Sequence, residues 1–197
     1  FTRTQSRNEV FYAMFKPTER VNWPGNIKKL KLLEDDDGAV LVDANNNPAI
    51  DDLTGFIKDT ATTFWSSGQD GGSVEVGGAG GRLLLTSPGS RTIYTDTGAN
   101  QALEAFEVDN FEPADFGVAS DAALWALFGS TTEAGYEQQV AWARGYDAYD
   151  QDGDGITNEP RRWILGDILH SQPLVVNYGA TSGFDQDNPD LRLLVGT

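Results

Sequence analysis

The chain has 197 residues and carries 30 Asp and Glu against 14 Lys and Arg side chains, so its formal net charge at pH 7 is −16. It has no Cys and a single His, which excludes thiol catalysis, cysteine-ligated metals and sites that need two histidines. The acidic excess argues against a nucleic-acid partner, because phosphate neutralisation needs clustered basic side chains, and no apolar run has the roughly 18 residues that a membrane span requires.

Short apolar runs separated by Gly and Pro predict several β-strands. The first is Val10–Phe15, which is rich in aromatic residues. Residues 26–42 predict a β-hairpin, because apolar residues alternate with lysines and Asp37-Gly38 supplies a turn. Further strands are expected at Thr92–Thr95, Pro173–Tyr178 and Leu191–Val195. Many short strands with turns between them are typical of a β-sandwich, barrel or propeller.

Two segments have helical periodicity. Asp121–Phe128 places leucines and Phe128 at helical spacing, with Ser120 or Asp121 as its cap and Gly129 as its end. Glu133–Arg144 carries one apolar face and should end at Gly145. We therefore expect a mainly β fold with a few short helices.

Residues 66–81 predict a glycine-rich loop. Its core, Gly77–Gly81, is not followed by Gly-Lys-Ser/Thr, and Leu83 stands where a dinucleotide fingerprint needs Gly. Backbone flexibility or the close approach of a strand explains these glycines better than phosphate binding does.

The segment Asp150–Glu159 has the strongest chemical signal in the sequence. Side-chain oxygens fall at positions 1, 3, 5 and 9 of a loop that starts at Asp150, and Gly155 at position 6 permits a sharp turn. Ile156 at position 7 can offer its carbonyl while its side chain anchors the loop in the core. Alternate oxygens around one centre suit Ca²⁺, so we predict a calcium loop with these ligands: Asp150, Asp152, Asp154, the Ile156 carbonyl and Asn158.

The loop departs from the EF-hand pattern at its end. Arg161 stands at position 12, where a bidentate Glu is expected, so Asn158 or Glu159 must close the site. Asp147 is expected to be an outer neighbour of the site or simply solvated. An acidic, glycine-rich surface turn without a metal is the alternative interpretation of the same residues.

A weaker copy of the same spacing runs from Asp43 to Asp51. Only two of its oxygen-bearing positions are carboxylates, and Pro48 replaces the glycine of the sharp turn. Asn-rich turns satisfy their own backbone groups, so a structural turn is favoured over a second ion site. His170 is interpreted as a hydrogen-bonded structural residue, and the five tryptophans as packing residues.

An ordered series of motifs resembles the C-terminal domain of the type IV pilus proteins of the PilC/PilY family. The similarity runs from about residue 9 to the end of the chain, and its most specific element is Gly166-Asp-Ile-Leu-His170-Ser-Gln-Pro173. The other motifs are Trp23-Pro-Gly-Asn26, Phe64-Trp65, Gly77-Gly-Ala79, Arg91-Thr-Ile-Tyr94, Trp142-Ala-Arg144-Gly145-Tyr-Asp147 and Trp163-Ile-Leu-Gly166.

The resemblance implies an incomplete modified β-propeller, quinoprotein-like in shape, with residues 1–197 as the N-terminal portion of a single domain. It implies a secreted protein at the tip of type IV pili that acts in assembly, adhesion and control of extension and retraction. Its partners would be minor pilins, a host-cell or surface ligand, and the remainder of its own propeller. The chain begins without Met and ends within an apolar run, so we expect it to be cut from a larger polypeptide.

The resemblance also implies that Asp150–Asn158 corresponds to the family's calcium loop. The family usually has Asp where Asn158 stands, so one charge is missing here, and Glu159 is a candidate to compensate. A non-enzymatic, calcium-dependent pilus protein is the leading hypothesis. A quinoprotein-like dehydrogenase with the same propeller shape is the alternative, although the adjacent cysteines common in such enzymes are missing.

Overall fold

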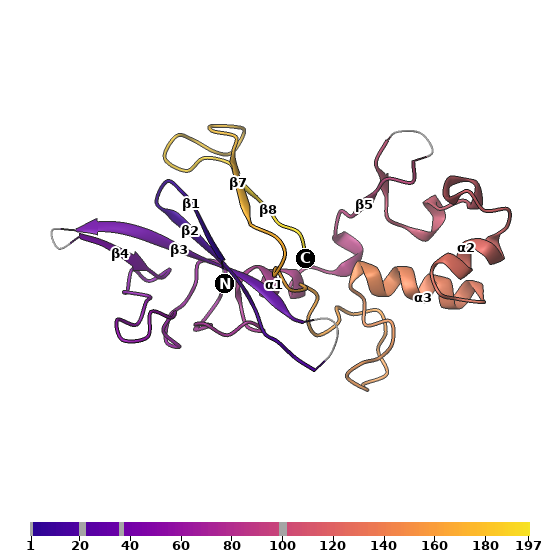
Figure 1. The fold of residues 1–197 in the computed structure, drawn as a ribbon, viewed down its shortest axis with the longest axis horizontal. Coiled ribbons are helices and arrows are strands. Elements are labelled where there is room, and N and C mark those ends of the chain that lie inside the picture. Colours follow the sequence, from indigo (N-terminus) through magenta and orange to yellow (C-terminus); the bar gives the residue numbers. More distant parts are fainter. Residues whose placement is uncertain (1, 20–22, 36–37, 99–101) are drawn as a thin grey trace. The chain divides into compact units, whose positions relative to one another are not determined.

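A computed structural model describes residues 2–19, 23–35, 38–98 and 102–197. The chain divides into two compact units (Figure 1). The first comprises Phe1–Leu83 and Trp163–Thr197, and the second comprises Leu84–Arg162. Within the described residues, none of the helices combines the length and the apolar character needed to cross a bilayer.

A four-stranded antiparallel sheet in chain order forms the centre of the first unit. Its strands are β1 (Thr2–Ser6), β2 (Glu9–Phe15), β3 (Gly25–Asp35) and β4 (Gly38–Val42). The strand predicted at Val10–Phe15 and the hairpin predicted over 26–42 are confirmed, although Asp37 of the predicted turn lies outside the described residues. Strand β1 was not predicted, because its sequence TRTQS is polar throughout.

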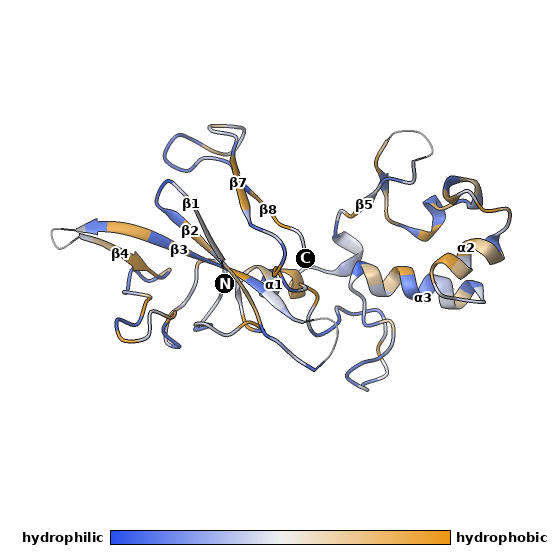
Figure 2. Ribbon diagram, viewed as in Figure 1, coloured by the Kyte–Doolittle hydropathy of each residue, from blue (hydrophilic) through white to orange (hydrophobic). Residues whose placement is uncertain are grey.

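This sheet is buried on both faces, since the side chains of β2 alternate between two separate clusters. Leu30 pairs with Val10 on one face, and Ile27 pairs with Ala13 on the other. Figure 2 shows hydrophilic and hydrophobic stretches mixed along β3. The first cluster comprises Val10, Tyr12, Leu30, Ala49, Ile57 and Ala61. The second comprises Phe11, Ala13, Ile27 and Ile168, with Trp65, Ala79, Val175, Leu193 and Val195 packed against it.

The side of the sheet that carries Phe11 is covered by a hairpin and by a short helix. The hairpin consists of β7 (Leu174–Asn177) and β8 (Leu191–Leu194), both at predicted positions. The helix is α1 (Gly78–Leu84), where a loop was expected. A Cβ atom on Gly80 would stand 2.2 Å from the Trp163 ring, and one on Gly78 would stand 2.6 Å from the Ile27 carbonyl. The close approach predicted for these glycines is therefore confirmed.

A salt bridge is buried within the first unit. Lys28 Nζ lies 2.5 Å from Asp70 Oδ2, with exposed side-chain fractions of 0% and 1%. The Asp70 carboxylate also accepts bonds from Thr63 N, Thr63 Oγ1 and Ser66 Oγ, each at 2.7 Å. Lys28 Nζ additionally donates to the Val76 carbonyl. Both charges are thus paired and hydrogen-bonded, as buried ions must be.

The second unit contains short strands, 3₁₀ turns and two α-helices. Helix α2 (Asp121–Leu127) has Ser120 as its N-cap, and α3 (Glu133–Arg144) ends at Gly145 in a left-handed conformation, as predicted. Of the strand predicted at Thr92–Thr95, only β5 (Tyr94–Thr95) is present, paired with β6 (Glu104–Ala105). The 3₁₀ turns are η1 (Pro88–Ser90), η2 (Val108–Asn110) and η3 (Pro113–Phe116). The core consists of Phe111, Leu124, Tyr136 and Val140, with further aromatic rings around it.

The prediction of a mainly β, incomplete modified β-propeller is wrong. The described residues form one four-stranded sheet and two separate two-stranded sheets, none of them closed or arranged as propeller blades. Most of the described chain lies outside helices and strands. Short apolar runs and frequent turns are common to many β architectures, so their spacing did not specify a propeller. The expectation that further blades would cover this chain loses its basis.

The packing role predicted for the tryptophans is supported in both units. Trp163 Nε1 donates a 2.9 Å hydrogen bond to the Gly25 carbonyl, and Trp23 stacks on Phe15 with a ring separation of 5.8 Å. Trp142 lies 3.9 Å from the Arg161 guanidinium carbon. His170, in contrast, is exposed, so the structural role expected for it is not supported.

Candidate metal centre

The segment predicted to bind calcium is a loop whose two ends are joined by main-chain hydrogen bonds. The Asp147 amide donates to the Glu159 carbonyl at 2.8 Å, and the Arg161 amide donates to the Gly145 carbonyl at 3.0 Å. Between them, Tyr146 and Pro160 form an isolated antiparallel bridge. Helix α3 ends at Gly145, and residues 159–161 return to lie beside residues 145–147. Residues 147–159 therefore form a closed loop.

The carboxylates of Asp150, Asp152 and Asp154 lie together in this loop. One oxygen of each lies within 4.8 Å of the others. Three backbone amides orient these side chains: Gly155 N donates to Asp150 Oδ1 at 3.0 Å, Asp154 N to Asp152 Oδ1 at 3.2 Å, and Ile156 N to Asp154 Oδ1 at 2.7 Å. Each carboxylate keeps further acceptor capacity for a ligand.

This donor set fits a divalent hard cation. Two oxygens bound to one Ca²⁺ at about 2.4 Å are separated by at most about 4.8 Å, which matches the spacing of the three aspartates. The ligands are all oxygens, as Ca²⁺ prefers, and the described sequence here offers no nitrogen or sulfur ligand that would favour a softer metal. Tight turns at Gly153 and Gly155, both with positive φ, bring the alternate side chains together.

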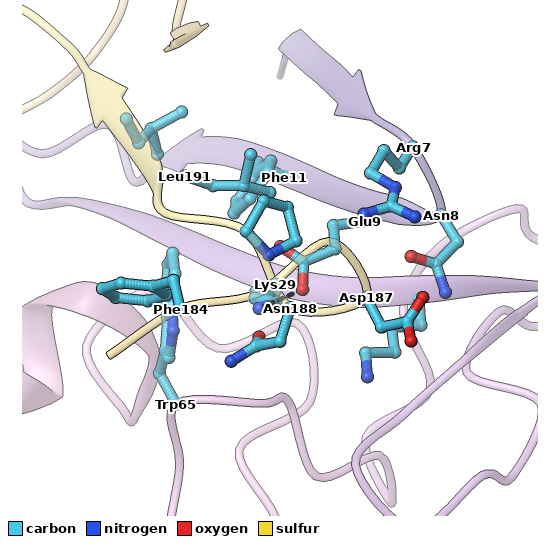
Figure 3. Close-up of a pocket in the computed structure, with 13 residues that line it drawn as sticks. Arg7, Asn8, Glu9, Phe11, Lys29, Trp65, Phe184, Asp187, Asn188 and Leu191 are labelled. Carbon is cyan, nitrogen blue, oxygen red and sulfur yellow. Dashed lines mark ion pairs between the residues drawn. The ribbon is translucent and has the colours of Figure 1, made fainter. Parts of the chain in front are cut away.

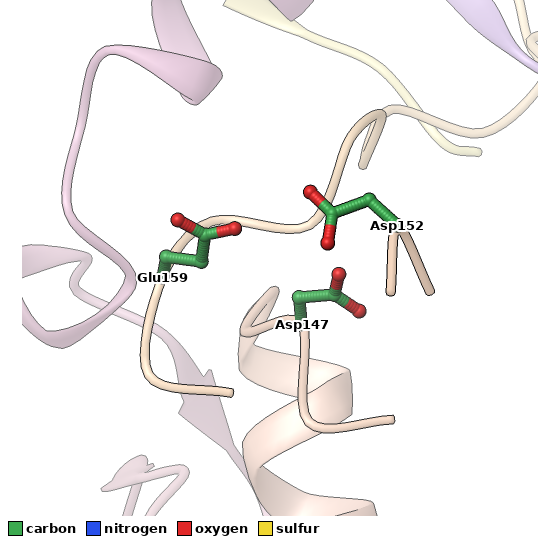
Figure 4. Close-up of side chains that lie close together, drawn as sticks. All are labelled: Asp147, Asp152 and Glu159. Carbon is green, nitrogen blue, oxygen red and sulfur yellow. The ribbon is translucent and has the colours of Figure 1, made fainter. Parts of the chain in front are cut away.

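A second group of carboxylates shares Asp152 with the first. Asp147, Asp152 and Glu159 also place one oxygen each within 4.8 Å of one another. Figure 4 shows their carboxylates turned toward a common space, with Asp147 shortly after the end of helix α3. Asp147 is 2% exposed and accepts two hydrogen bonds from the Gln151 amide, at 2.9 and 3.0 Å. Of the two alternatives expected for Asp147, the solvated one is therefore wrong, and its carboxylate lies at the candidate site.

The electrostatics of the loop favour a cation. Burial raises the pKa of Glu159 above its ordinary value, and the negative charges of Asp154, Asp152, Asp147 and Asp150 raise it further. A positive ion in this space would oppose that repulsion and favour the ionised carboxylate. The Glu159 carboxylate is thus brought to the group that contains Asp152, as expected of a residue that could compensate for the missing charge at Asn158.

The two remaining predicted ligands are Ile156 and Asn158, and both are exposed. The Ile156 side chain is 46% exposed, so the prediction that it anchors the loop in the core is wrong. The sequence could not reveal this, because an apolar residue after a tight turn is equally compatible with surface exposure. Asn158 is exposed in the same loop, and its role as a ligand stays a prediction.

The weaker motif from Asp43 to Asp51 forms backbone turns. Asp43 is 2% exposed, and its carboxylate accepts from the amides of Asn45, Asn47 and Thr62 at 2.9–3.0 Å. Asp51 caps a separate turn by accepting from Leu53 N and Thr54 N. These bonds match the structural turn that the Asn-rich sequence favours. Burial acts to raise the pKa of Asp43, but these hydrogen bonds outweigh it and hold the pKa below its ordinary value.

We expect Asp43→Asn to lower the free energy of unfolding by about 1–3 kcal/mol at pH 7, because buried amides lose a charged acceptor. The lowered pKa means that this stabilisation is present above the ordinary value of 3.8 and is lost as pH falls through the folded-state value. Urea unfolding from pH 7 toward pH 2 should show the variant and the wild type converging. Asp52→Asn, an exposed neighbour, is the control and should leave stability unchanged.

Comparisons with protein-family models, with curated proteins and with solved structures gave no match to this chain. The resemblance to the PilC/PilY family therefore stays a prediction that is based on the sequence motifs alone.

Proposed function

We propose that the chain is a calcium-binding, non-enzymatic module whose second unit is stabilised by the ion. The observation that carries this proposal is the convergence of Asp150, Asp152 and Asp154 within 4.8 Å, next to Asp147 and Glu159. These five carboxylates lie in one short loop without a basic residue between positions 147 and 159. Such a concentration of negative charge is favourable only where a cation or solvent offsets the repulsion.

The ion would act on the loop and on what the loop joins. With the carboxylate repulsion relieved, the segment between Asp147 and Glu159 is held in one conformation. Asp147 lies three residues after Arg144, the last residue of helix α3, so this order extends toward the helix end, where the Arg161 amide donates to the Gly145 carbonyl. Calcium binding would thus rigidify the end of α3 and the chain that leaves the loop. Such a local change can shift an interface between two states.

The cellular setting that we propose is the tip of a type IV pilus, outside the cell. It is supported by the PilC/PilY-like motifs. It is also supported by the loop itself, which has only one acidic residue, Glu159, at its closing end, because the modest calcium affinity that this implies suits an extracellular module. Minor pilins and a host-cell or other surface ligand are the partners that this setting implies, with roles in pilus biogenesis, adhesion and twitching motility.

The dehydrogenase alternative has no structural support of its own. It depended on a quinoprotein-like propeller shape, and the described residues do not form one. The calcium-binding module does not depend on that shape, because its ligands all come from a single loop.

A calcium titration tests the proposal directly. Isothermal titration should give one saturable binding event, and the loop peptides of residues 145–161 should exchange amide hydrogens more slowly in calcium than in chelator. Magnesium should bind more weakly, since it demands a smaller and more regular oxygen shell. Identical exchange with calcium and with chelator would disprove the calcium-dependent module. Retention of the chain in sheared pilus fractions of the organism that encodes it tests the pilus setting separately.

A further inference from the structure

A cavity of about 360 Å³ lies on the first unit, at the face of the sheet that carries Glu9 and Phe11 (Figure 3). Its floor comes from β2 and β3, one side from the turn at Arg7 and Asn8, and the other from residues 184–189 before β8. This volume is at the lower end of the range of small-molecule sites, about 300–1,000 Å³, so one or two rings would fill it.

The lining has a net positive charge, three basic against two acidic side chains, although the chain is strongly acidic. Arg7, Lys29 and Lys31 all contribute, and they are three of only 14 basic residues in the protein. Lys29 is neutralised by Glu9, whose Oε1 lies 2.5 Å from its Nζ. Lys31 Nζ lies 4.9 Å from the centre of the Phe64 ring and pairs with no carboxylate of the described residues. Lys31 can therefore bind an anion without first losing an ion pair.

Strand register explains why these side chains gather here. Phe11 pairs with Lys29 and Glu9 pairs with Lys31, so the four side chains point to the same face of the sheet. Arg7 extends the same edge, held in a left-handed conformation with φ of 55° while its guanidinium bonds the Gln186 carbonyl. This conformation belongs to the two-residue turn between β1 and β2, since Ser6 pairs with Glu9 on either side of Arg7 and Asn8.

Two aromatic rings stand at one end of the cavity. Trp65 packs at 5.8 Å and 33° on the buried Phe11, which fixes its orientation. Phe184 is 43% exposed, and Figure 3 shows it on the same side as Trp65, away from Arg7 and Asp187. Asn8, Asn188 and Asp187 provide amide and carboxylate groups on the rim. The cavity therefore combines an apolar ring-binding end with hydrogen-bonding groups and with net positive charge.

We propose that this cavity binds an acidic saccharide, a sugar ring that bears a carboxylate or a sulfate. The flat apolar face of a sugar ring fits against Trp65 or Phe184, its hydroxyls match the Asn and Asp groups, and its acid group pairs with Lys31 and Arg7. A purely apolar ligand would leave these polar groups desolvated and unpaired. A neutral sugar would lack the partner for Lys31, so acidity is the feature that the site selects.

Ligand-observed NMR with D-glucuronate tests the assignment, using D-glucose as the neutral counterpart. At about 10 mM, enough to fill a site of millimolar affinity, glucuronate should bind and D-glucose should bind at least fivefold more weakly. Lys31→Gln should weaken glucuronate binding about tenfold with little change for D-glucose. Lys16→Gln removes the same charge from an exposed lysine outside the cavity and should change neither.

The aromatic end needs its own variant. Phe184→Ala removes an exposed ring and should weaken both sugars, whereas Trp65→Ala also removes packing on Phe11 and is interpreted only if its unfolding curve matches the wild type. Equal binding of glucuronate to the wild type and to Lys31→Gln would overturn the proposal, as would no binding at all. Binding of adenosine monophosphate in preference to glucuronate would assign the cavity to a nucleotide and refute the saccharide.

Discussion

Replacing Asp70 with Ala should lower the free energy of unfolding by about 3–5 kcal/mol, the largest effect expected from a single substitution in this chain. The change leaves the Lys28 ammonium buried without its charge partner and removes the acceptor of the Thr63 and Ser66 bonds. Since small domains are stable by only about 5–15 kcal/mol, the variant should be close to unfolding. Urea denaturation followed by circular dichroism measures the loss.

Two comparisons separate the buried charge from a general packing defect. Glu75→Gln breaks the exposed pair with Lys16 and should cost less than about 1 kcal/mol. Lys28→Met combined with Asp70→Leu removes both charges and should recover much of the stability that Asp70→Ala loses. A loss below about 1 kcal/mol for Asp70→Ala would contradict the importance of this pair.

The loss of stability in Asp70→Ala should depend on pH in a definite direction. Burial lowers the pKa of Lys28 below 10.5, although the bond and charge of Asp70 act to raise it. Without Asp70 the folded-state pKa should fall further, so the folded protein releases this proton at a lower pH than the unfolded chain does. Stability then rises with pH over that interval, and the deficit of Asp70→Ala should shrink between pH 7 and about pH 10.

Replacing Asp152 with Ala should abolish the stabilisation by calcium. Asp152 belongs to both carboxylate groups of the loop, so its replacement disrupts both groups at once. At a calcium concentration one hundred times the dissociation constant, the wild type should gain about 2.7 kcal/mol, and the variant close to none. Asp154→Ala, which affects one group only, should keep part of the gain.

The measurement should follow the second unit rather than the whole chain. Hydrogen exchange of peptides from α3 and the loop, with calcium and with chelator, reports this region directly. Asp109→Ala, an exposed aspartate of the same unit outside the loop, is the matched control and should respond to calcium like the wild type. An unchanged calcium response in Asp152→Ala would exclude this loop as the binding site.

The sequence predicted local elements well and their assembly poorly. Helix α3 was predicted with its correct bounds because its apolar face and the terminal Gly145 agree. The hairpin of β3 and β4 was found by its alternation, but Lys28 was not recognised as a core residue. A lysine between apolar residues is expected to face solvent, and only the distant Asp70, 42 residues later, makes its burial possible.

The same limit applies to the candidate site. The aspartates at positions 150, 152 and 154 were found because their spacing is local. Asp147 and Glu159 join them only because main-chain bonds bring the two ends of the loop together. Helix α1 was missed for a related reason: its glycines disfavour a helix in isolation and are tolerated because Trp163 and β3 pack so closely against it.

The paired ends of the loop have a consequence for kinetics. Since residues 145–147 and 159–161 are already joined, ion binding does not require a long chain segment to close first. The entropic cost of closing the loop is met when the chain folds. Exchange between ion and solvent should therefore be rapid, and affinity should follow the number of carboxylates more than the length of the segment. The stretch from Gly145 to Arg161 should accordingly be transferable to the end of another helix as a self-contained unit.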